Sequence, residues 1–142
     1  MNRHDRLEDH LAKVPLFQGL SKKELRLISQ LATELDEPAG TVLIEEGKVG
    51  HEFIVLVEGE IEVTQGGRKI GDHGPGAYVG EIALLEHIPR TATVVATTPV
   101  RLEVIGQREF AGLLEEVPEL AEQLSATAAR RLAESSSAER GS

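Results

Sequence analysis

Glycine, glutamate and arginine are combined in one stretch, Tyr78–Val94, in a pattern that suits a sugar phosphate. Gly80 is followed directly by Glu81, and Arg90 comes nine residues after Glu81. A guanidinium binds a phosphate through two parallel charge-assisted hydrogen bonds, and a carboxylate accepts a hydrogen bond from a sugar hydroxyl. Glycine lets a backbone approach a ligand closely, and the amides that open a helix favour an anion. This stretch therefore predicts a small pocket for a sugar phosphate.

The overall charge limits which partners this pocket can serve. The chain carries 24 acidic and 15 basic residues, a formal net charge of -9. Nucleic-acid binders gain most of their affinity from basic residues that neutralise phosphates, and here the basic residues are scattered. We therefore expect no nucleic-acid partner. An anionic ligand has to enter against the average field of the protein, so its site needs local positive charge, which Arg90 supplies.

Length and composition favour one soluble domain. At 142 residues, the chain is long enough to bury a core without staples, and its lack of Cys excludes disulfides and thiolate metal sites. No apolar run approaches the roughly 18 residues of a membrane span, and the N-terminus has no signal-peptide core. We expect a cytoplasmic protein that does not contact a membrane.

Helical patterns are expected at both ends of the chain. At the start, residues 3–33 favour helices: apolar residues align over 3–14, and Ser21 with Glu24 forms a capping-box pattern before the Leu-rich stretch that ends at Leu31. At the other end, residues 107–134 favour two helices, the last opened by Pro118. The Ser-rich segment 135–142 lacks apolar residues and is expected to be a disordered tail.

The middle of the chain, residues 38–106, has the character of a β domain. Short β-branched runs at 41–44, 53–57, 60–64, 68–70, 91–97 and 100–104 alternate with glycine-rich turns, of which 71–76 is the longest. The alternation points Ile61, Val63, Val100, Leu102 and Val104 inward. Strands this short, with turns about every eight to twelve residues, indicate an antiparallel sandwich or barrel. The fold class is therefore α+β, with about eight strands flanked by N- and C-terminal helices.

The motif has a family resemblance. Gly80-Glu-Ile-Ala-Leu-Leu85, together with Pro89-Arg-Thr-Ala-Thr-Val94, resembles the phosphate-binding cassette of cyclic-nucleotide-binding domains. This family includes the protein kinase A regulatory subunit, the catabolite activator protein and cyclic-nucleotide-gated channels. The resemblance extends from about Leu16 to Leu132, and it implies the β-roll, or jelly-roll, fold of that family. It indicates a stand-alone bacterial-type domain.

The resemblance also implies a role for each matching residue. Arg90 would pair with the cyclic phosphate, Glu81 would accept from the ribose 2′-hydroxyl with help from Gly80, and the amides of Ala83 and Ala92 would donate to phosphate oxygens. A hydroxyl at Thr91 can contact a guanine, so cGMP stays possible, although bacterial relatives with a hydroxyl there commonly respond to cAMP. The expected ligand-binding residues are Gly80, Glu81, Ile82, Ala83, Arg90, Thr91 and Ala92.

Several other residues have two interpretations. Val42, Ile44, Val55 and Val79 are candidate walls for the purine, but a core role is favoured for each. Arg130 and Arg131 lie where some family members place a base contact, yet solvated helical arginines are favoured. The last helix carries Leu120, Leu124, Ala128 and Leu132 four residues apart, a face suited to a lid, a homodimer contact or both.

The expected function is that of a sensor without catalysis. The domain would bind cAMP, with cGMP as the second candidate, reversibly and reposition its last helix, acting on a protein target that the sequence does not identify. The alternative is a ligand-independent scaffold on the same fold. The five His residues show no metal-binding spacing, and no Gly-x-Ser-x-Gly elbow is present, so neither a metal, another cofactor nor an enzyme is expected.

Overall fold

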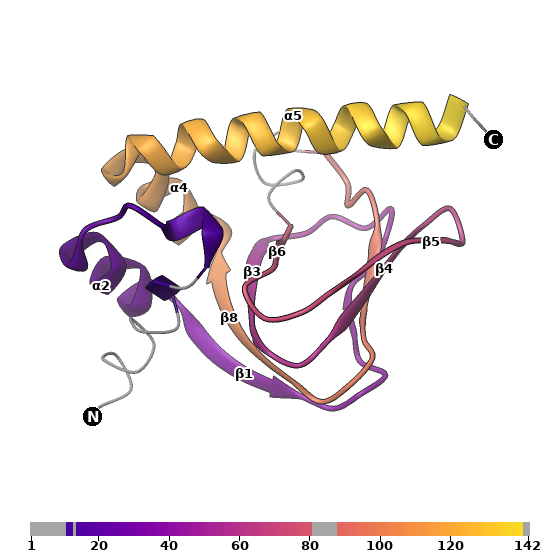
Figure 1. Cartoon of the computed structure of the whole chain (residues 1–142), viewed down its shortest axis with the longest axis horizontal. Coiled ribbons are helices and arrows are strands. Elements are labelled where there is room, and N and C mark those ends of the chain that lie inside the picture. The colour runs from indigo at the N-terminus through magenta and orange to yellow at the C-terminus, as the bar shows by residue number, and fades with distance from the viewer. Residues whose placement is uncertain (1–10, 13, 81–87, 141–142) are drawn as a thin grey trace.

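Two antiparallel four-stranded sheets form a roll, with the shorter helices at one end and the last helix running along the roll (Figure 1). The structure, a computed structural model, describes residues 11, 12, 14–80 and 88–140. In the first sheet the order is β1 (Thr33–Glu37), β8 (Val100–Gly106), β3 (Glu52–Glu58) and β6 (Tyr78–Val79). In the second it is β2 (Val42–Ile44), β7 (Thr93–Ala96), β4 (Ile61–Gln65) and β5 (Arg68–His73). The predicted antiparallel β-roll of about eight strands with flanking helices is confirmed.

Strand β3 shows why its apolar run is unbroken. Side chains alternate between the two faces of a strand. Phe53 and Val55 lie in a cluster with the helices, whereas Ile54 and Leu56 lie in a cluster inside the roll. A strand buried on both faces needs apolar residues at successive positions, so β3 separates the two cores.

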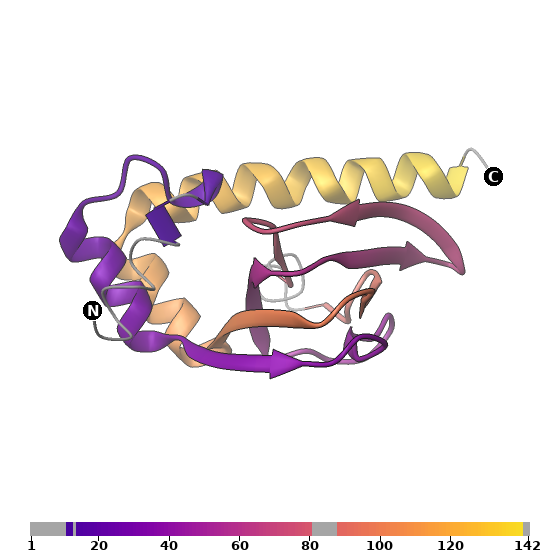
Figure 2. The ribbon, with the colours of Figure 1, turned by 60° about the horizontal axis from the view of Figure 1, so that its bottom comes forward.

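The core inside the roll contains the residues whose alternation predicted their direction. Ile61, Val63, Val100 and Leu102 are buried there, and Val104 packs against them as a partly buried side chain. Figure 2 shows the strands of the roll lying beside one another beneath the last helix. At the end of the β4–β5 hairpin, Gly66 and Gly67 have φ values of 60° and 80°, as a two-residue turn of this kind requires.

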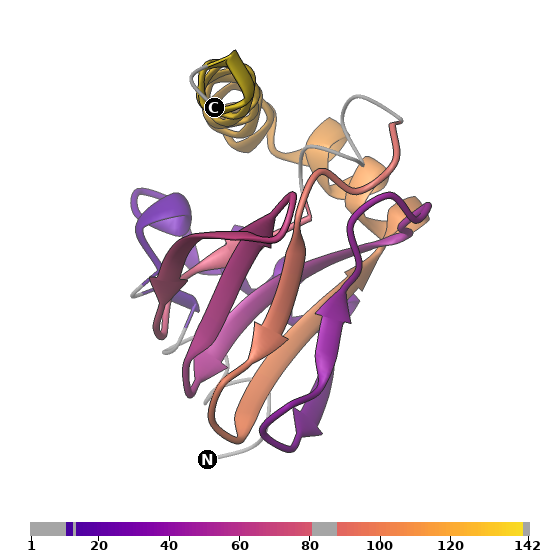
Figure 3. The ribbon, with the colours of Figure 1, turned by 90° about the vertical axis from the view of Figure 1, so that its right-hand side faces the viewer.

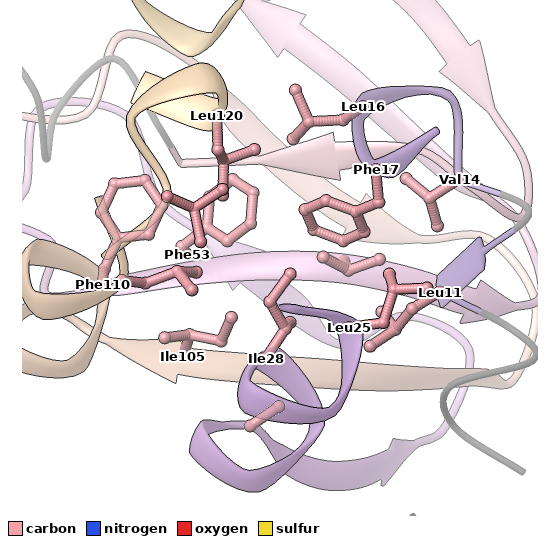
Figure 4. Close-up of a cluster of buried hydrophobic side chains, with 14 of the residues drawn as sticks. Leu11, Val14, Leu16, Phe17, Leu25, Ile28, Phe53, Ile105, Phe110 and Leu120 are labelled. Atoms are coloured by element: carbon pink, nitrogen blue, oxygen red, sulfur yellow. The ribbon is translucent and has the colours of Figure 1, made fainter. Parts of the chain in front are cut away.

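The second core fills the helical end of the molecule (Figure 4). It is built by η1 (Pro15–Phe17), α2 (Lys22–Leu31), α4 (Gln107–Glu116) and the start of α5 (Pro118–Arg140), all against β3 and β8. The ring of Phe53 stacks on that of Phe110 at 4.7 Å between centroids and lies 5.8 Å from that of Tyr78. This core fixes the helices to one face of the first sheet.

The predicted capping box at the start of α2 is confirmed. The Ser21 hydroxyl accepts a hydrogen bond from the Glu24 amide at 3.1 Å, and the Glu24 carboxylate accepts one from the Ser21 amide at 2.9 Å. These two bonds satisfy backbone donors that a helix N-terminus leaves without partners.

Strand β1 was not predicted, because its sequence lacks a strand pattern. Thr33-Glu-Leu-Asp-Glu37 has one apolar residue, Leu35, whose side chain is 41% exposed. The strand exists because it pairs in register with β8 along its whole length, from Thr33 opposite Val104 to Glu37 opposite Val100. Its acidic side chains suit the edge of a sheet, where charge opposes pairing with another chain.

Two other boundaries differ from the prediction. Strand β5 continues to His73, so only part of the turn predicted over 71–76 is a turn. Helix α5 continues to Arg140, beyond the helix end expected near Glu134, so residues 135–140 of the expected tail are helical. The physical reason is that no helix breaker occurs between Pro118 and Gly141. The helix predicted over 3–14 lies largely outside the described residues.

Candidate functional site

The backbone of Arg90 is fixed by the turn that precedes β3. The amide of Gly47 donates a hydrogen bond to the carbonyl of Arg90 at 2.8 Å, and the amide of Arg90 donates to the carbonyl of Lys48 at 2.9 Å. The amide of Glu46 also donates to the Thr93 hydroxyl at 3.0 Å. Three hydrogen bonds therefore tie the Arg90 segment to the turn at residues 45–50, which lies more than 40 residues earlier in the chain.

The Arg90 side chain points into the protein, where 5% of it is exposed. One terminal nitrogen, Nη1, donates to the carbonyl of Gly80 at 2.9 Å, and the other, Nη2, donates to the carbonyl of Glu52 at 2.7 Å. A buried charge is costly unless it is hydrogen-bonded, and bonds from an ionised donor are stronger than neutral ones. The carbonyls thus keep a guanidinium ordered at the start of β3 and just after the end of β6.

Two glycines make room for this guanidinium. A Cβ atom at Gly50 would overlap the Nε and Cζ atoms of Arg90. A Cβ atom at Gly80 would lie 2.7 Å from both Nη1 of Arg90 and the carbonyl oxygen of Glu52, and Gly80 has a φ of +98°. A side chain at either position would therefore displace the guanidinium, and at Gly80 the positive φ disfavours a side chain as well.

A carboxylate lies beside the same guanidinium. Glu52 Oε2 is 3.7 Å from Nη2 of Arg90, and the Glu52 side chain is 54% exposed. Glu52 thus contributes two groups to the site: a backbone carbonyl held in β3 and a half-exposed anion at the end of its side chain.

A second arginine, Arg101 on β8, provides a contrast. Its guanidinium donates two hydrogen bonds to the Asp36 carboxylate, at 2.9 and 3.5 Å, and lies within 3.8 Å of carboxylate oxygens of Glu34 and Glu58. The hydrogen bond from Arg101 lowers the pKa of the Asp36 carboxyl, and the same bond raises the pKa of Arg101. Because three carboxylates surround it and 32% of its side chain is exposed, Arg101 is part of a surface ion-pair network.

The structure places four of the seven predicted site residues. Gly80 and Arg90 are in contact, and Thr91 and Ala92 follow Arg90 as partly buried residues, with Ala92 packed against the core of the roll. Glu81, Ile82 and Ala83 lie outside the described residues. The assignment of all seven as ligand-binding stays a prediction.

Gly50 and Glu52 were missed by the sequence reasoning. In the sequence, Gly50 is one more glycine at a turn and Glu52 is a polar residue at the start of a strand, so neither carries a signal of its own. Their role depends on a contact across 38 positions, between Glu52 and Arg90. The family motif alone does not reveal this contact.

The candidate purine walls separate into different environments. Val55 belongs to the helical core, and Ile44 and Val79 belong to the core of the roll, whereas Val42 is 54% exposed. The favoured core role therefore suits Ile44, Val55 and Val79. Arg130 is exposed and bonds the Thr127 hydroxyl at 3.3 Å, consistent with a solvated helical arginine, while the side chain of Arg131 is outside the described set.

The structure also contains an apolar cavity of about 310 Å³. It is lined by Leu11, Val14, Val55, Leu56, Val57, Pro75 and Gly76. Neither Arg90 nor the residues around it, Gly50, Glu52 and Gly80, line this cavity. Over the described residues, no group of three or more His, Asp or Glu is placed to hold a metal, and no helix is long and apolar enough to cross a membrane.

Comparison with known proteins identifies the family. The family model of the cyclic nucleotide-binding domain matches residues 36–117. This range includes Arg90, Arg101 and every strand of the roll except the first three residues of β1. A cAMP-dependent protein kinase regulatory subunit from Eremothecium gossypii is 39% identical over 115 residues, covering 80% of this chain and 25% of the relative. The chain belongs to the family of cyclic nucleotide-binding domains.

Solved structures share the fold. The catabolite activator protein of Thermus thermophilus aligns with a TM-score of 0.77 at 29% identity, over 86% of this chain and 60% of that one. The regulatory subunit of a cAMP-independent protein kinase A from Trypanosoma brucei aligns with a TM-score of 0.81 at 24% identity, over 88% of this chain and 45% of that one. The second likeness concerns the fold alone. The chain spans between 23% and 29% of the length of the first curated relatives it matches.

Proposed function

We propose that this domain is a sensor that binds a cyclic nucleotide reversibly, cAMP in first place and cGMP in second, and that Arg90 binds the phosphate. The observation that carries this proposal is the buried guanidinium of Arg90, which is held by two carbonyls within a space formed by Gly50 and Gly80. In a protein with a net charge of -9, an anionic ligand needs a local positive charge, and Gly50 and Gly80 leave room for one. An ordered cation at this place lowers the entropic cost of binding an anion.

The remaining roles follow from the family cassette. Glu81 accepts a hydrogen bond from the ribose 2′-hydroxyl, and the amides of Ala83 and Ala92 donate to phosphate oxygens. The Thr91 hydroxyl is the group that can contact a guanine, so Thr91 influences the preference between cAMP and cGMP. The partly buried position of Thr91, directly after Arg90, is compatible with this role. The cyclic nucleotide is the small-molecule partner in this proposal, and its binding needs no metal and involves no catalytic step.

Helix α5 is the proposed reporter of ligand binding. Leu120 and Leu124 are buried and anchor its first turns against α4 and η1. Beyond Leu124, no side chain that the structure describes is buried, and Figure 3 shows α5 nearly end-on, outside the two sheets. In our proposal, phosphate binding draws the segment around Arg90 inward and α5 repacks its apolar face over the ligand. Such a switch requires the ligand to bind the closed state more tightly than the open one.

The site is tested by calorimetric titration of cAMP and cGMP into the wild type and Arg90→Ala. Removing the guanidinium leaves the phosphate without its charged partner, at a cost of roughly 2–5 kcal/mol, which raises Kd by more than about 25-fold. Arg101→Ala is the matched control, because it deletes an arginine of the surface network and should leave Kd unchanged. Circular dichroism checks that each variant folds, and Arg90→Lys, which keeps the charge, should lose less affinity than Arg90→Ala. Equal binding by wild type and Arg90→Ala would refute the site.

The switch is tested separately by amide hydrogen exchange. Saturating cAMP should slow exchange over residues 119–134 if α5 closes, and the same ligand should leave these amides unchanged in Arg90→Ala. Unchanged exchange in the wild type, at ligand concentrations where calorimetry shows binding, would refute the helix movement while leaving the binding proposal intact.

The titration also decides the alternative, a ligand-independent scaffold that works through protein contacts. That alternative predicts no heat with either nucleotide. Further parts of the proposal are a cytoplasmic location, a protein target, no nucleic-acid or membrane contact, and a homodimer contact through α5. Sedimentation of the protein with and without cAMP tests the dimer.

A further inference from the structure

The groups that hold Arg90 differ in how freely they can move. The Glu52 carbonyl is fixed, because Glu52 pairs with Gly106 at the start of the β3–β8 ladder. The Glu52 carboxylate is at the end of a half-exposed side chain and lies 3.7 Å from the same nitrogen that the carbonyl binds at 2.7 Å. Glu52 thus offers Arg90 one fixed neutral acceptor, its carbonyl, and one movable anion, its carboxylate.

An incoming phosphate needs the same guanidinium. Two anions that approach one cation repel each other, and a carboxylate already near the guanidinium lowers the gain from adding the second anion. The carboxylate can relieve this repulsion by rotating into solvent, since its side chain is 54% exposed, but it then gives up its attraction to Arg90. In both cases the Glu52 carboxylate lowers the net free energy gained when the phosphate binds to Arg90.

We infer that the Glu52 carboxylate is a built-in competitor of the ligand phosphate for Arg90. This inference rests on the proposed function and adds a regulatory element to it: the backbone of Glu52 orders the guanidinium, and the side chain of Glu52 weakens the affinity for a cyclic nucleotide. The carboxylate returns to Arg90 when the ligand leaves. The domain therefore binds its ligand less tightly than the Arg90 site itself allows, which favours reversible sensing.

Strand β3 supplies a matched control at its other end. Glu58 closes the strand that Glu52 opens, its side chain is 58% exposed, and its Oε1 lies 3.7 Å from Nη1 of Arg101. Glu58→Gln therefore removes the same charge, from the same strand, at the same distance from an arginine, away from the candidate site. It separates a local effect at Arg90 from the general effect of making the protein one charge less negative.

The experiment compares cAMP affinities by calorimetry for the wild type, Glu52→Gln, Glu52→Asp and Glu58→Gln. Gln keeps the shape and the backbone carbonyl but removes the charge, so Glu52→Gln should bind cAMP roughly two- to fivefold more tightly, the range expected for one partly exposed ion pair. Glu52→Asp retains the anion and should stay within about twofold of the wild type, and Glu58→Gln should do the same. Thermal unfolding without ligand checks that all variants are folded.

The outcomes distinguish the inference from the function on which it rests. If the wild type binds cAMP and Glu52→Gln binds no more tightly, the competitor role is refuted and the sensor function stands. An equal gain in Glu58→Gln or in Glu52→Asp also refutes it, because the effect is then one of bulk charge or of side-chain shape. If neither the wild type nor Glu52→Gln binds cAMP or cGMP, the proposed function itself fails.

Discussion

The space that Gly50 leaves for Arg90 allows a quantitative test of the site. In Gly50→Ala the new methyl group would overlap Nε and Cζ of Arg90. Because these atoms belong to the end of a flexible side chain, the guanidinium should move instead of the backbone. Nε, which would overlap the new Cβ most closely, must shift by about 2 Å to reach ordinary contact distance. The hydrogen bonds to Gly80 and Glu52, now 2.9 and 2.7 Å long, would then be lost or badly weakened.

The expected cost follows from those two bonds. A hydrogen bond from a charged group contributes about 1.5–3 kcal/mol, so the pair is worth about 3–6 kcal/mol. The displaced guanidinium recovers part of this in water, and alanine restricts the unfolded chain more than glycine does, which offsets about 0.4–1 kcal/mol. We expect Gly50→Ala to lower the free energy of unfolding by about 2–3 kcal/mol. Binding of cAMP should weaken as well.

Urea denaturation followed by far-UV circular dichroism measures this cost, since the chain has no Trp. Gly112→Ala, in the middle of α4 with nothing within 4 Å of the new Cβ, is the control and should stabilise the protein slightly. The decisive comparison repeats Gly50→Ala in an Arg90→Ala background, where the methyl group no longer meets a guanidinium and should cost almost nothing. An equal loss in both backgrounds would show that Gly50 is needed for its own backbone and would refute the reasoning.

Two further predictions concern the scaffold. Ser21→Ala removes the capping box of α2 and should lower the free energy of unfolding by about 1 kcal/mol in urea denaturation, whereas Ser125→Ala, exposed in α5, should not; equal losses would contradict a capping role. The Arg101 hydrogen bond lowers the pKa of Asp36 from its ordinary 3.8, so the contribution of Asp36 to stability is present above pH 3.8 and is lost as the pH falls through the lower folded value. The stability difference between wild type and Asp36→Asn should therefore be larger at pH 6 than at the acid end of an acid titration, and a constant difference would contradict this linkage.

The sequence was a good guide wherever one local pattern decided the structure. Ser21 and Glu24 lie three residues apart and cap a helix, and the alternation around Ile61 and Leu102 placed those side chains in the core of the roll. It failed at β1, where an acidic segment becomes a strand because β8 offers it a partner. Propensity gives no sign of a strand that owes its existence to pairing.

The same distinction holds for the candidate site. Arg90 and Gly80 were found because they share one short motif, and the structure brings them into contact. Gly50 and Glu52 come from another part of the chain, and their contacts with Arg90 arise only when the turn before β3 pairs with the Arg90 backbone. When a site is assembled from two distant segments, a sequence motif reveals the residues of one segment, and the residues of the other are found only in the structure.

The length of α5 turns its anchored end into the fulcrum of a lever. Leu120 and Leu124 fix the helix near its start, and from Leu124 to Arg140 it extends by about 24 Å at 1.5 Å per residue. A tilt of about 10° at the anchored turns then moves the far end by about 4 Å, while the anchored turns themselves stay almost in place. Under the proposed function, small rearrangements of the packing around Phe110 and Leu120 would therefore become a larger displacement at the far end of α5, where a protein target could detect it.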